Sequence, residues 1–447
     1  MIKLRNMMQN RFHNILILIF VFGCLCATAQ EKELLTVEEA VSIALENNFQ
    51  IKNATNELKI EETSASPGFA GMLPSLNAVA DNNNSIQNID QTRSDGTKIA
   101  LDNAKNNSLT YGVQLDWTIF DGLGMFARYD QLQEIRKRGD AELKLSILET
   151  VSEVMITYYD LVQQKQQLNA LDSTLVISAQ RVDLANNRFI IGRASKLELL
   201  NAQVDENTDQ ALYLRQQELF KNTKIRLNQI MGRDVKLDFR VIDLISIDST
   251  LELETLERQT TTQNPQLQAQ LINKRISELQ LKQIKGNRLP KVSAQAGYMF
   301  SDSESSLGFT THNNARGFNY GFSARLNLFD GFKQNRNEKI AKIEIANSEL
   351  LIEQQTQTLL SQLNIAYQTY KTNLKLMELE VHNEAIAKEN LEITMAKHRI
   401  GTIPTIEFRT AQLNYINAVV RSSNAIYEAK LSEITLKELA GNLSLGM

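Results

Sequence analysis

Residues 109–122 read LTYGVQLDWTIFDG, and residues 318–331 read FNYGFSARLNLFDG. In both stretches apolar side chains alternate with polar or small ones, which is typical of a strand with one apolar and one polar face. Both stretches also end in Phe-Asp-Gly, and these two endings lie 209 residues apart. A similarity over such a distance indicates that one structural unit occurs twice in the chain.

Further residues recur at a fixed spacing. At a separation of 209 residues the chain repeats Ile191-Gly192 as Ile400-Gly401, Glu198 as Glu407 and Gly232 as Gly441. Leu73-Pro74 recurs as Leu289-Pro290 at a separation of 216, so the first copy carries seven extra residues in one loop. We therefore predict a first repeat over residues 30–232, a linker over 233–250 and a second repeat over 251–447.

Each repeat is expected to contribute one hairpin to a sheet. The hairpins span 74–119 and 290–328, with strands at 74–86, 107–119, 290–301 and 317–328 and polar connections over 84–107 and 301–316. Long strands with aromatic residues on one face match the wall of an outer-membrane barrel, although a small soluble sheet packed on helices would show the same alternation. Four strands cannot close a barrel, since the smallest barrels use about eight, and an open edge does not persist in hydrocarbon. Neighbouring chains are therefore expected to supply the remaining strands.

Two proline-free stretches, 123–190 and 332–399, are rich in residues that favour helix. At 1.5 Å per residue each would form a helix on the order of 100 Å long. Apolar residues recur at coiled-coil spacing. They are Ile147, Val154, Leu161, Leu168, Leu175 and Val182, then Leu363, Tyr367, Tyr370, Leu374, Met377 and Val381, and towards the end of the chain Ile406, Leu413, Val420, Tyr427 and Ile434. A soluble helical bundle would show the same heptads, so the strands decide between the two interpretations.

The first residues have the pattern of an export signal. Three basic residues precede an apolar run from Ile15 to Phe22, and Ala27-Thr28-Ala29 offers small residues for cleavage. The run is shorter than the roughly 20 residues that a membrane-spanning helix needs. We predict a signal peptide over residues 1–29, with lipidation of Cys24 as the alternative.

Composition excludes several classes of function. Both cysteines lie inside the predicted signal, so the mature chain has no thiol for a disulfide, a metal site or a nucleophile. Removal of three basic residues changes the formal charge from -4 to -7 (45 minus 52), which gives no attraction to nucleic acid. The histidines are scattered, and no catalytic or phosphate-binding motif is present. We expect no enzymatic activity, no metal or cofactor, and no nucleic-acid partner.

The duplicated features, taken in order, resemble the outer membrane efflux proteins, the TolC-like channel family, over nearly the whole mature chain. The features are the opening helix Leu35-Thr36-Val37-Glu38-Glu39-Ala40, the two Leu-Pro pairs, the two Phe-Asp-Gly endings, and the helical tips at 188–194 and 398–404. The resemblance implies an α+β membrane protein that forms a trimer. Its barrel would take four strands from each protomer and continue into a long α-helical coiled-coil barrel across the periplasm.

By the same resemblance the protein is the outer-membrane exit channel of a tripartite efflux or type I secretion system. Substrate would pass, chemically unaltered, from an inner-membrane pump through a periplasmic adaptor (membrane fusion protein) to the outside. The barrel would contact outer-membrane lipid, and the linker 233–250 would form a belt around the tunnel. A periplasmic coiled-coil adaptor or scaffold without a pore is the alternative, because adaptors also have long hairpins. Adaptors lack duplicated membrane-type strands.

The resemblance also assigns a binding role to the two helical tips. The adaptor-binding residues would be Ile191, Gly192, Arg193, Ile400, Gly401 and Thr402. Each tip glycine has a local reason as well, because a tight turn between helices favours a residue that is free to take a positive φ.

In the family, acidic residues six positions after each tip glycine face the pore aperture, and Glu198 and Glu407 match that spacing. His398 occupies the aromatic position of the gate latch. The chain departs from the family at Thr410, where the pattern has another acid, and at Ile403, where it has a basic latch residue. The contacts of the gate are therefore expected to differ. Without the resemblance, either glutamate would be interpreted as a solvated surface residue.

Overall fold

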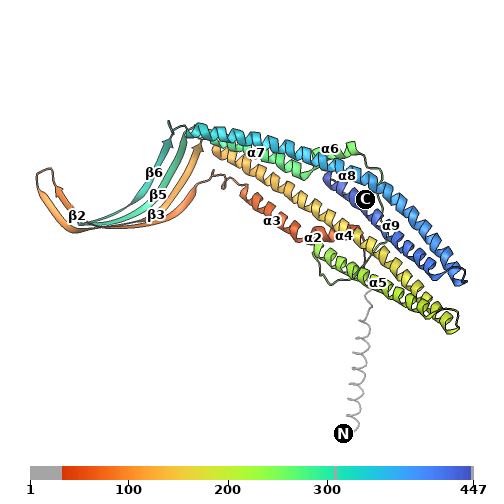
Figure 1. Cartoon of the computed structure of the whole chain (residues 1–447). Coiled ribbons are helices and arrows are strands. Elements are labelled where there is room, and N and C mark those ends of the chain that lie inside the picture. Colours follow the sequence, from red (N-terminus) through yellow and green to blue (C-terminus); the bar gives the residue numbers. More distant parts are fainter. Residues whose placement is uncertain (1–32, 307–309, 444–447) are drawn as a thin grey trace, which may run out of the picture.

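The structure is a computed structural model that describes residues 33–306 and 310–443. The predicted signal peptide and Cys24 lie outside the described residues. Figure 1 shows a curved sheet at one end of the molecule and a long bundle of helices that continues from it. The tips of two helical hairpins form the other end, far from the sheet.

The sheet has four antiparallel strands in the order β2-β3-β5-β6. The strands are β2 (Ser75–Thr92), β3 (Lys98–Asp121), β5 (Lys291–Ser305) and β6 (His312–Arg325). All four predicted strands and both hairpins are present. Because β2 and β6 each have one strand neighbour, the sheet has two open edges within the described chain.

Two of the predicted boundaries are wrong. Most of the expected polar connection over 84–107 is strand, and only residues 93–97 turn between β2 and β3. Polar residues there show no apolar alternation, but their backbones pair across the hairpin and so keep the ladder. At the other edge β6 ends at Arg325, so Leu326 and Leu328 are not in the strand. Arg325 pairs with Lys291, the residue after Pro290, and proline has no N–H to extend the ladder.

The register places the alternating residues on the expected faces. Ala78, Val113, Tyr298 and Phe318 lie opposite one another across the four strands, so the apolar residues share one face. Aromatic rings pack on this face, where Tyr111 stacks on Phe300 with ring centroids 5.1 Å apart. The opposite face carries polar and small residues, with Asn77, Gln114, Gly297 and Asn319 in one row.

The long helices are present as predicted. Helix α4 (Gly124–Ile190) and helix α8 (Lys333–Arg399) have 67 residues each. Their antiparallel partners, α5 (Lys196–Ile230) and α9 (Thr405–Leu439), have 35 residues each. Each second helix begins and ends 209 residues after the first, as its sequence numbers show.

The Phe-Asp-Gly ending connects strand to helix in both places. The aspartate accepts a hydrogen bond from the first turn of the following helix, from Met125 N to Asp121 Oδ1 (3.0 Å) and from Gln334 N to Asp330 Oδ2 (2.8 Å). The glycine that follows has a positive φ, and so does the next residue, Leu123 or Phe332. This turn sets the direction in which each long helix leaves the sheet.

Four shorter helices complete the bundle within the residues that the structure describes. They are α2 (Val37–Asn47), α3 (Phe49–Ser64), α6 (Leu253–Gln263) and α7 (Pro265–Gly286). Asn48 caps α3 and donates a hydrogen bond to Ile230 O (2.8 Å), while Asn264 caps α7 and donates to Leu439 O (3.1 Å). In the predicted linker, β4 (Phe239–Val241) pairs in parallel with β1 (Glu33–Leu35).

Helices and strands follow the same lateral order. Helix α3 packs against α4, α4 against α7, and α7 against α8, which matches the order β2-β3-β5-β6 of the strands they adjoin. The main hydrophobic core lies where α2, α4, α5, α9 and the linker meet, and it contains Val154, Leu161 and Phe239. None of the described helices is long and apolar enough to cross a membrane.

The heptad prediction holds in part of the bundle. Val154, Leu161, Leu363, Tyr370 and Ile434 are buried. Val381, Ile406 and Leu413 were expected in the core but are exposed in the single chain. Near the tip of α9 the buried residues are instead Phe408, which stacks on His398 of α8, and Arg409 and Gln412, which contact α5 and α4.

Candidate functional site at the helical tips

The two tips are turns that join antiparallel helices, α4 to α5 and α8 to α9. Gly192 has φ +74° and Gly401 has φ +78°, so both tip glycines take the positive φ expected for a tight interhelical turn. Backbone hydrogen bonds close each turn, from Arg193 N to Arg188 O (2.7 Å) and from Thr402 N to Lys397 O (3.1 Å). Ser195 then begins α5 by accepting from Glu198 N.

All six residues predicted to bind an adaptor are exposed. The exposed fractions of Ile191 and Ile400 are 64% and 76%, and Ile190 beside them is 70% exposed. Isolated exposed apolar residues are common, but these isoleucines gather at the two turns. The tips therefore present an apolar surface with Arg193 at its edge.

Glu198 lies between the two hairpins. Its carboxylate accepts a hydrogen bond from Thr405 Oγ1 at the start of α9 (3.1 Å), and Arg188 Nη1 lies 3.9 Å from the same oxygen. The side chain is 29% exposed. Glu198 thus joins the first tip to the second.

Glu407 differs from Glu198 in its surroundings. It is exposed in the first turn of α9 and has no salt-bridge partner among the described residues. Thr410, one turn further along α9, is exposed too. The structure therefore does not bring the two glutamates into the same set of contacts.

His398 is buried in the last turn of α8, with 5% of its surface exposed. Its ring stacks on Phe408 of α9, with centroids 5.0 Å apart and planes 5° from parallel. Contact with the other hairpin is made by its backbone, because Arg188 Nη2 donates to His398 O (3.0 Å). The imidazole packs inside its own hairpin rather than across the two.

A second set of contacts between the hairpins is buried deeper in the bundle. Arg409 of α9 donates to both carboxylate oxygens of Asp209 on α5, at 2.7 and 2.9 Å. Ser178 of α4 donates to Asp209 Oδ2 (2.5 Å), and Gln412 Nε2 donates to Ser178 Oγ (2.9 Å). A charge-assisted bidentate pair of this kind fixes the orientation of both partners. Arg181 and Asp205 form a neighbouring ion pair.

The sequence did not reveal this buried polar cluster of Ser178, Asp209, Arg409 and Gln412. Charged residues on a helix are usually solvated, and the two charged members are 200 residues apart. One signal was available. Arg409 follows Phe408 directly, and a heptad through Phe408 instead of Ile406 would have placed Arg409 and Gln412 beside the buried face.

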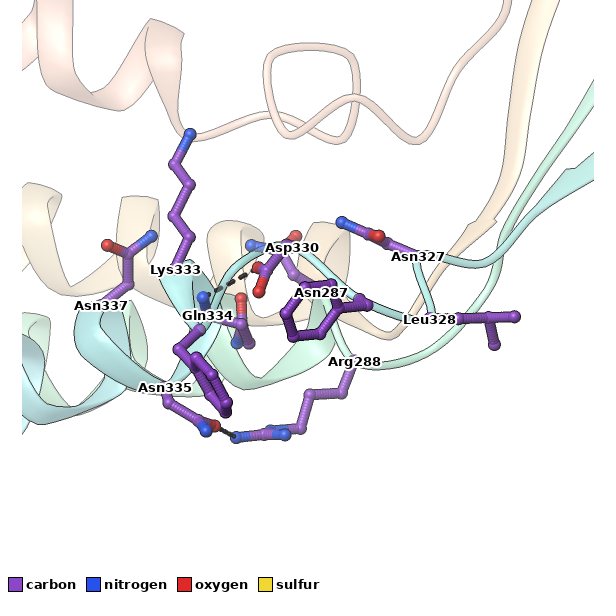
Figure 2. Close-up of a pocket in the computed structure, with 11 residues that line it drawn as sticks. Asn287, Arg288, Asn327, Leu328, Asp330, Lys333, Gln334, Asn335 and Asn337 are labelled. Atoms are coloured by element: carbon purple, nitrogen blue, oxygen red, sulfur yellow. Dashed lines mark hydrogen bonds between the residues drawn. The ribbon is translucent and has the colours of Figure 1, made fainter.

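A pocket of about 550 Å³ lies at the junction of the sheet and the helices. Figure 2 shows its lining, with Asp330 hydrogen-bonded to Gln334 and Asn335 bonded to Arg288. Leu328 and Phe329, which also line it, are 90% and 74% exposed. Apolar side chains of this size are thus left uncovered beside polar groups.

No group of side chains suited to a metal ion occurs among the described residues. The polar contacts at the tips hold helices together rather than enclosing a small molecule. The arrangement can therefore position two hairpins relative to each other, and it offers carboxylates near an end of the bundle.

The architecture, a sheet continued by paired long helices, is that of bacterial outer-membrane channels. The Campylobacter jejuni CmeC outer membrane channel has the same fold, with a TM-score of 0.75 at 18% identity over 91% of this chain and 85% of that one. The Neisseria gonorrhoeae MtrE outer membrane channel, described in its open state, gives a TM-score of 0.70 at 13% identity over 91% of this chain and 89% of that one.

The family model for outer membrane efflux proteins matches residues 40–233 and 256–442, and the chain belongs to this family. A curated relative, the proteases secretion protein PrtF of Dickeya chrysanthemi, is 21% identical over 91% of this chain and 88% of its own length. The outer membrane protein TolC of Vibrio cholerae is 19% identical over 91% of this chain and 90% of its own length.

Membership of this family confirms three predictions made from the sequence. They are the resemblance to the TolC-like channels, the channel function and the outer-membrane location. Members of the family are transport channels rather than enzymes. The alternative of a periplasmic adaptor without a pore is therefore not favoured.

Proposed function

We propose that the protein is the exit duct of a tripartite efflux or type I secretion system and that it works as a homotrimer. Each protomer contributes two repeats, and the three copies together form a twelve-stranded barrel continued by a helical tunnel. Substrate moves through this duct passively, and an inner-membrane pump and a periplasmic adaptor supply energy and connection. The observation that carries the proposal is that sheet and helices end in matching open edges.

The open edges lie on corresponding sides of the two layers. Strand β2 and helix α3 end one side, and strand β6 and helix α8 end the other. A second copy placed head to tail would pair its β2 with β6 and pack its α3 on α8. Because each added copy leaves a new open edge, all edges are paired only when the copies close into a ring.

Two corresponding glycines support this arrangement. A Cβ on Gly122 would meet the carbonyl oxygen of Gly286 at 2.0 Å, since the connection from α7 to β5 covers that turn. Gly331 has a similar positive φ, yet no atom of the described part of the chain lies within 4 Å of its Cβ position. The pocket in Figure 2 surrounds this second turn. We infer that the connection from α3 to β2 of the next copy, residues 65–74, covers it.

The number of copies follows from the strand count and the family resemblance. Two copies give eight strands, which is about the smallest barrel and one that side chains fill. Three copies give twelve, and the apolar face would then turn outward to lipid while the row that contains Gln114 and Asn319 lines the interior.

At the tips we propose that Glu198 and Glu407 border the pore aperture and that His398 belongs to the latch of the gate. The contacts of Glu198 with Thr405 and Arg188 support a role in holding the two hairpins together. The exposed apolar residues beside Gly192 and Gly401 suit the hairpin of an adaptor. Neither role involves a chemical reaction.

A cysteine pair tests the ring directly. The mature chain is predicted to be free of cysteine, and Leu73 and Phe332 are 61% and 69% exposed. In the other repeat, Leu73 corresponds to Leu289 and Phe332 corresponds to Leu123, and both of these lie at the turn around Gly122. The double variant Leu73→Cys, Phe332→Cys should give covalent dimers and trimers on oxidation in detergent.

Each single-cysteine variant serves as one control. A pair of Phe332→Cys with Leu244→Cys, in the linker and 75% exposed, serves as the other. Neither control should give a ladder. Exclusively monomeric protein in the Leu73–Phe332 variant, or a ladder that stops at two copies, would contradict the proposed trimer.

A further inference from the structure

The burial of the His398 side chain disfavours a positive charge on its ring. Its Nδ1 is buried and has no hydrogen-bond partner among the residues that the structure describes. Phe408 covers one face of the ring in a parallel stack. An imidazolium carries N–H groups at both ring nitrogens and needs a partner for each, so the neutral ring fits this site better than the charged one.

Charged groups surround the ring on several elements. Helix α4 contributes Arg181 and Arg188, α5 contributes Glu198, and α8 itself carries Lys397 and Arg399 in the same turn. From α9 the facing residue is Phe408, and the backbone of Ile403 lies in the turn between α8 and α9. Arg181 is itself paired with Asp205 of α5, and the charges that act on the imidazole are Arg188 and Arg181 against Glu198.

The backbone of His398 also holds the two hairpins together. Arg188 of α4 donates to His398 O, and the same arginine lies beside Glu198, which accepts from Thr405. A shift of the last turn of α8 would therefore break the Arg188 contact and loosen the link between the tips. The imidazole ring and the backbone oxygen that accepts from Arg188 therefore belong to the same turn of α8.

We propose that His398 is an acid-sensitive switch, whose neutral ring keeps the two hairpin tips of a protomer closed and whose protonation separates them. The switch responds to the pH of the compartment that bathes the tips. It rests on the proposed function, because the tips are taken as the gate of the duct.

The direction of the pH effect follows from the surroundings. Burial first, and then the charges of Arg188 and Arg181, hold the pKa of His398 below its ordinary value of 6.5, while Glu198 and the Ile403 backbone oppose the shift. Opening moves the last turn of α8 away from Arg188 and Arg181 of the other hairpin, which brings the pKa of His398 back towards its ordinary value. Above pH 6.5 both states are neutral and closure is unaffected, whereas below it the open state binds the proton more tightly. Acid therefore favours opening.

The size of the effect is limited by the ordinary pKa. Between about pH 7.5 and pH 5.5, the ratio of open to closed tips should rise by at most about tenfold per protomer. This range stays above the usual pKa of surface carboxylates, about 4.

Spin labels at the two tips measure the opening. Full-length protein carrying Arg193→Cys and Thr402→Cys, both exposed positions, is labelled and diluted with unlabelled chains. The distance distribution within a protomer should shift towards longer distances at pH 5.5. Planar-bilayer recording of the same protein should show a higher open fraction at that pH.

The variant His398→Phe keeps an aromatic ring on Phe408 but cannot bind a proton. It should stay closed at both pH values, whereas His382→Gln, an exposed histidine on the same helix, should keep the full response. A pH response that persists in His398→Phe, or that disappears in His382→Gln alone, would overturn the switch.

The two readouts separate this inference from the proposed function. Protein that forms no channel in the bilayer contradicts the duct itself, whatever the spin labels report. Channels that conduct, with tip distances and open fraction that do not change between the two pH values, contradict only the role of His398.

Discussion

Asp209→Asn tests whether the buried polar cluster holds the two hairpins together. Asp209 is fully buried and Arg409 is 7% exposed, so the variant leaves a buried guanidinium without its bidentate partner. Breaking a buried pair in this way costs about 3–5 kcal/mol. Asp205 remains 3.6 Å from Arg409 Nε, which places the expected loss of local stability near the lower end, at about 3 kcal/mol.

Hydrogen exchange measures the loss where it occurs. Since about 1.4 kcal/mol corresponds to a factor of ten, backbone amides of α9 near Arg409 should exchange about 100-fold faster in Asp209→Asn. The control is Glu153→Gln, which removes a pair with Arg226 whose side chains are 44% and 65% exposed. An exposed pair contributes less than about 1 kcal/mol, so exchange near it should change by no more than a few-fold.

A double variant keeps the test informative if the single variant folds poorly. Replacing both partners, Asp209→Leu with Arg409→Met, removes the unpaired charge, and apolar replacements of buried ion pairs are often neutral. The backbone amides of α9 near residue 409 should exchange more slowly in this double variant than in Asp209→Asn. The reasoning fails if exchange near Arg409 is accelerated in Asp209→Asn no more than exchange near the Glu153–Arg226 pair is accelerated in Glu153→Gln. The cluster would then contribute no more than a surface pair.

Three further predictions concern the barrel, the aperture and the first helix. Leu115→Arg on the apolar face should cost about 2–4 kcal/mol and reduce the amount of the protein in outer-membrane fractions, whereas Gln114→Arg should be tolerated, and equal amounts of both would mean that the faces are reversed. Reconstituted channels should prefer cations and lose that preference in the double variant Glu198→Ala, Glu407→Ala, and unchanged single-channel selectivity would remove both carboxylates from the pore. Thr36→Ala removes the side-chain half of a capping box with Glu39 and should lower thermal stability by about 1 kcal/mol, with an unchanged melting temperature as the contrary result.

The sequence predicted those parts of the fold that depend on local patterns. Alternation in residues 109–119 identified both faces of β3, because side chains of a strand point alternately to its two sides. The ends of the long helices followed from the absence of proline and from the glycines at their turns, which the structure confirms at Gly192 and Gly401. Both kinds of signal lie within a few residues of the feature they predict.

Other features could not be predicted because they depend on partners far along the chain. The polar part of the β2–β3 hairpin shows no alternation, and its strand conformation is fixed by backbone pairing with the opposite strand. Ile406 was expected in the core, yet the face of α9 that meets α4 carries Gln412. Which face is buried was set by Asp209, 200 residues before Arg409, and by Ser178, 234 residues before Gln412. At the tip, the spacing located Glu198 but not Thr405, its hydrogen-bond partner.

The equal lengths of α4 and α8 restrict how this protein can change during evolution. A single inserted residue in one of these helices would rotate everything beyond it by about 100° and move its tip by about 1.5 Å. Glu198 would then lose its contact with Thr405, and the buried polar cluster would lose the pairing of Arg409 with Asp209. Tolerated changes of length should therefore be matched in both arms of both helix hairpins, and should come in multiples near seven residues. Relatives with longer or shorter tunnels are expected to differ by whole heptads in all four helices at once.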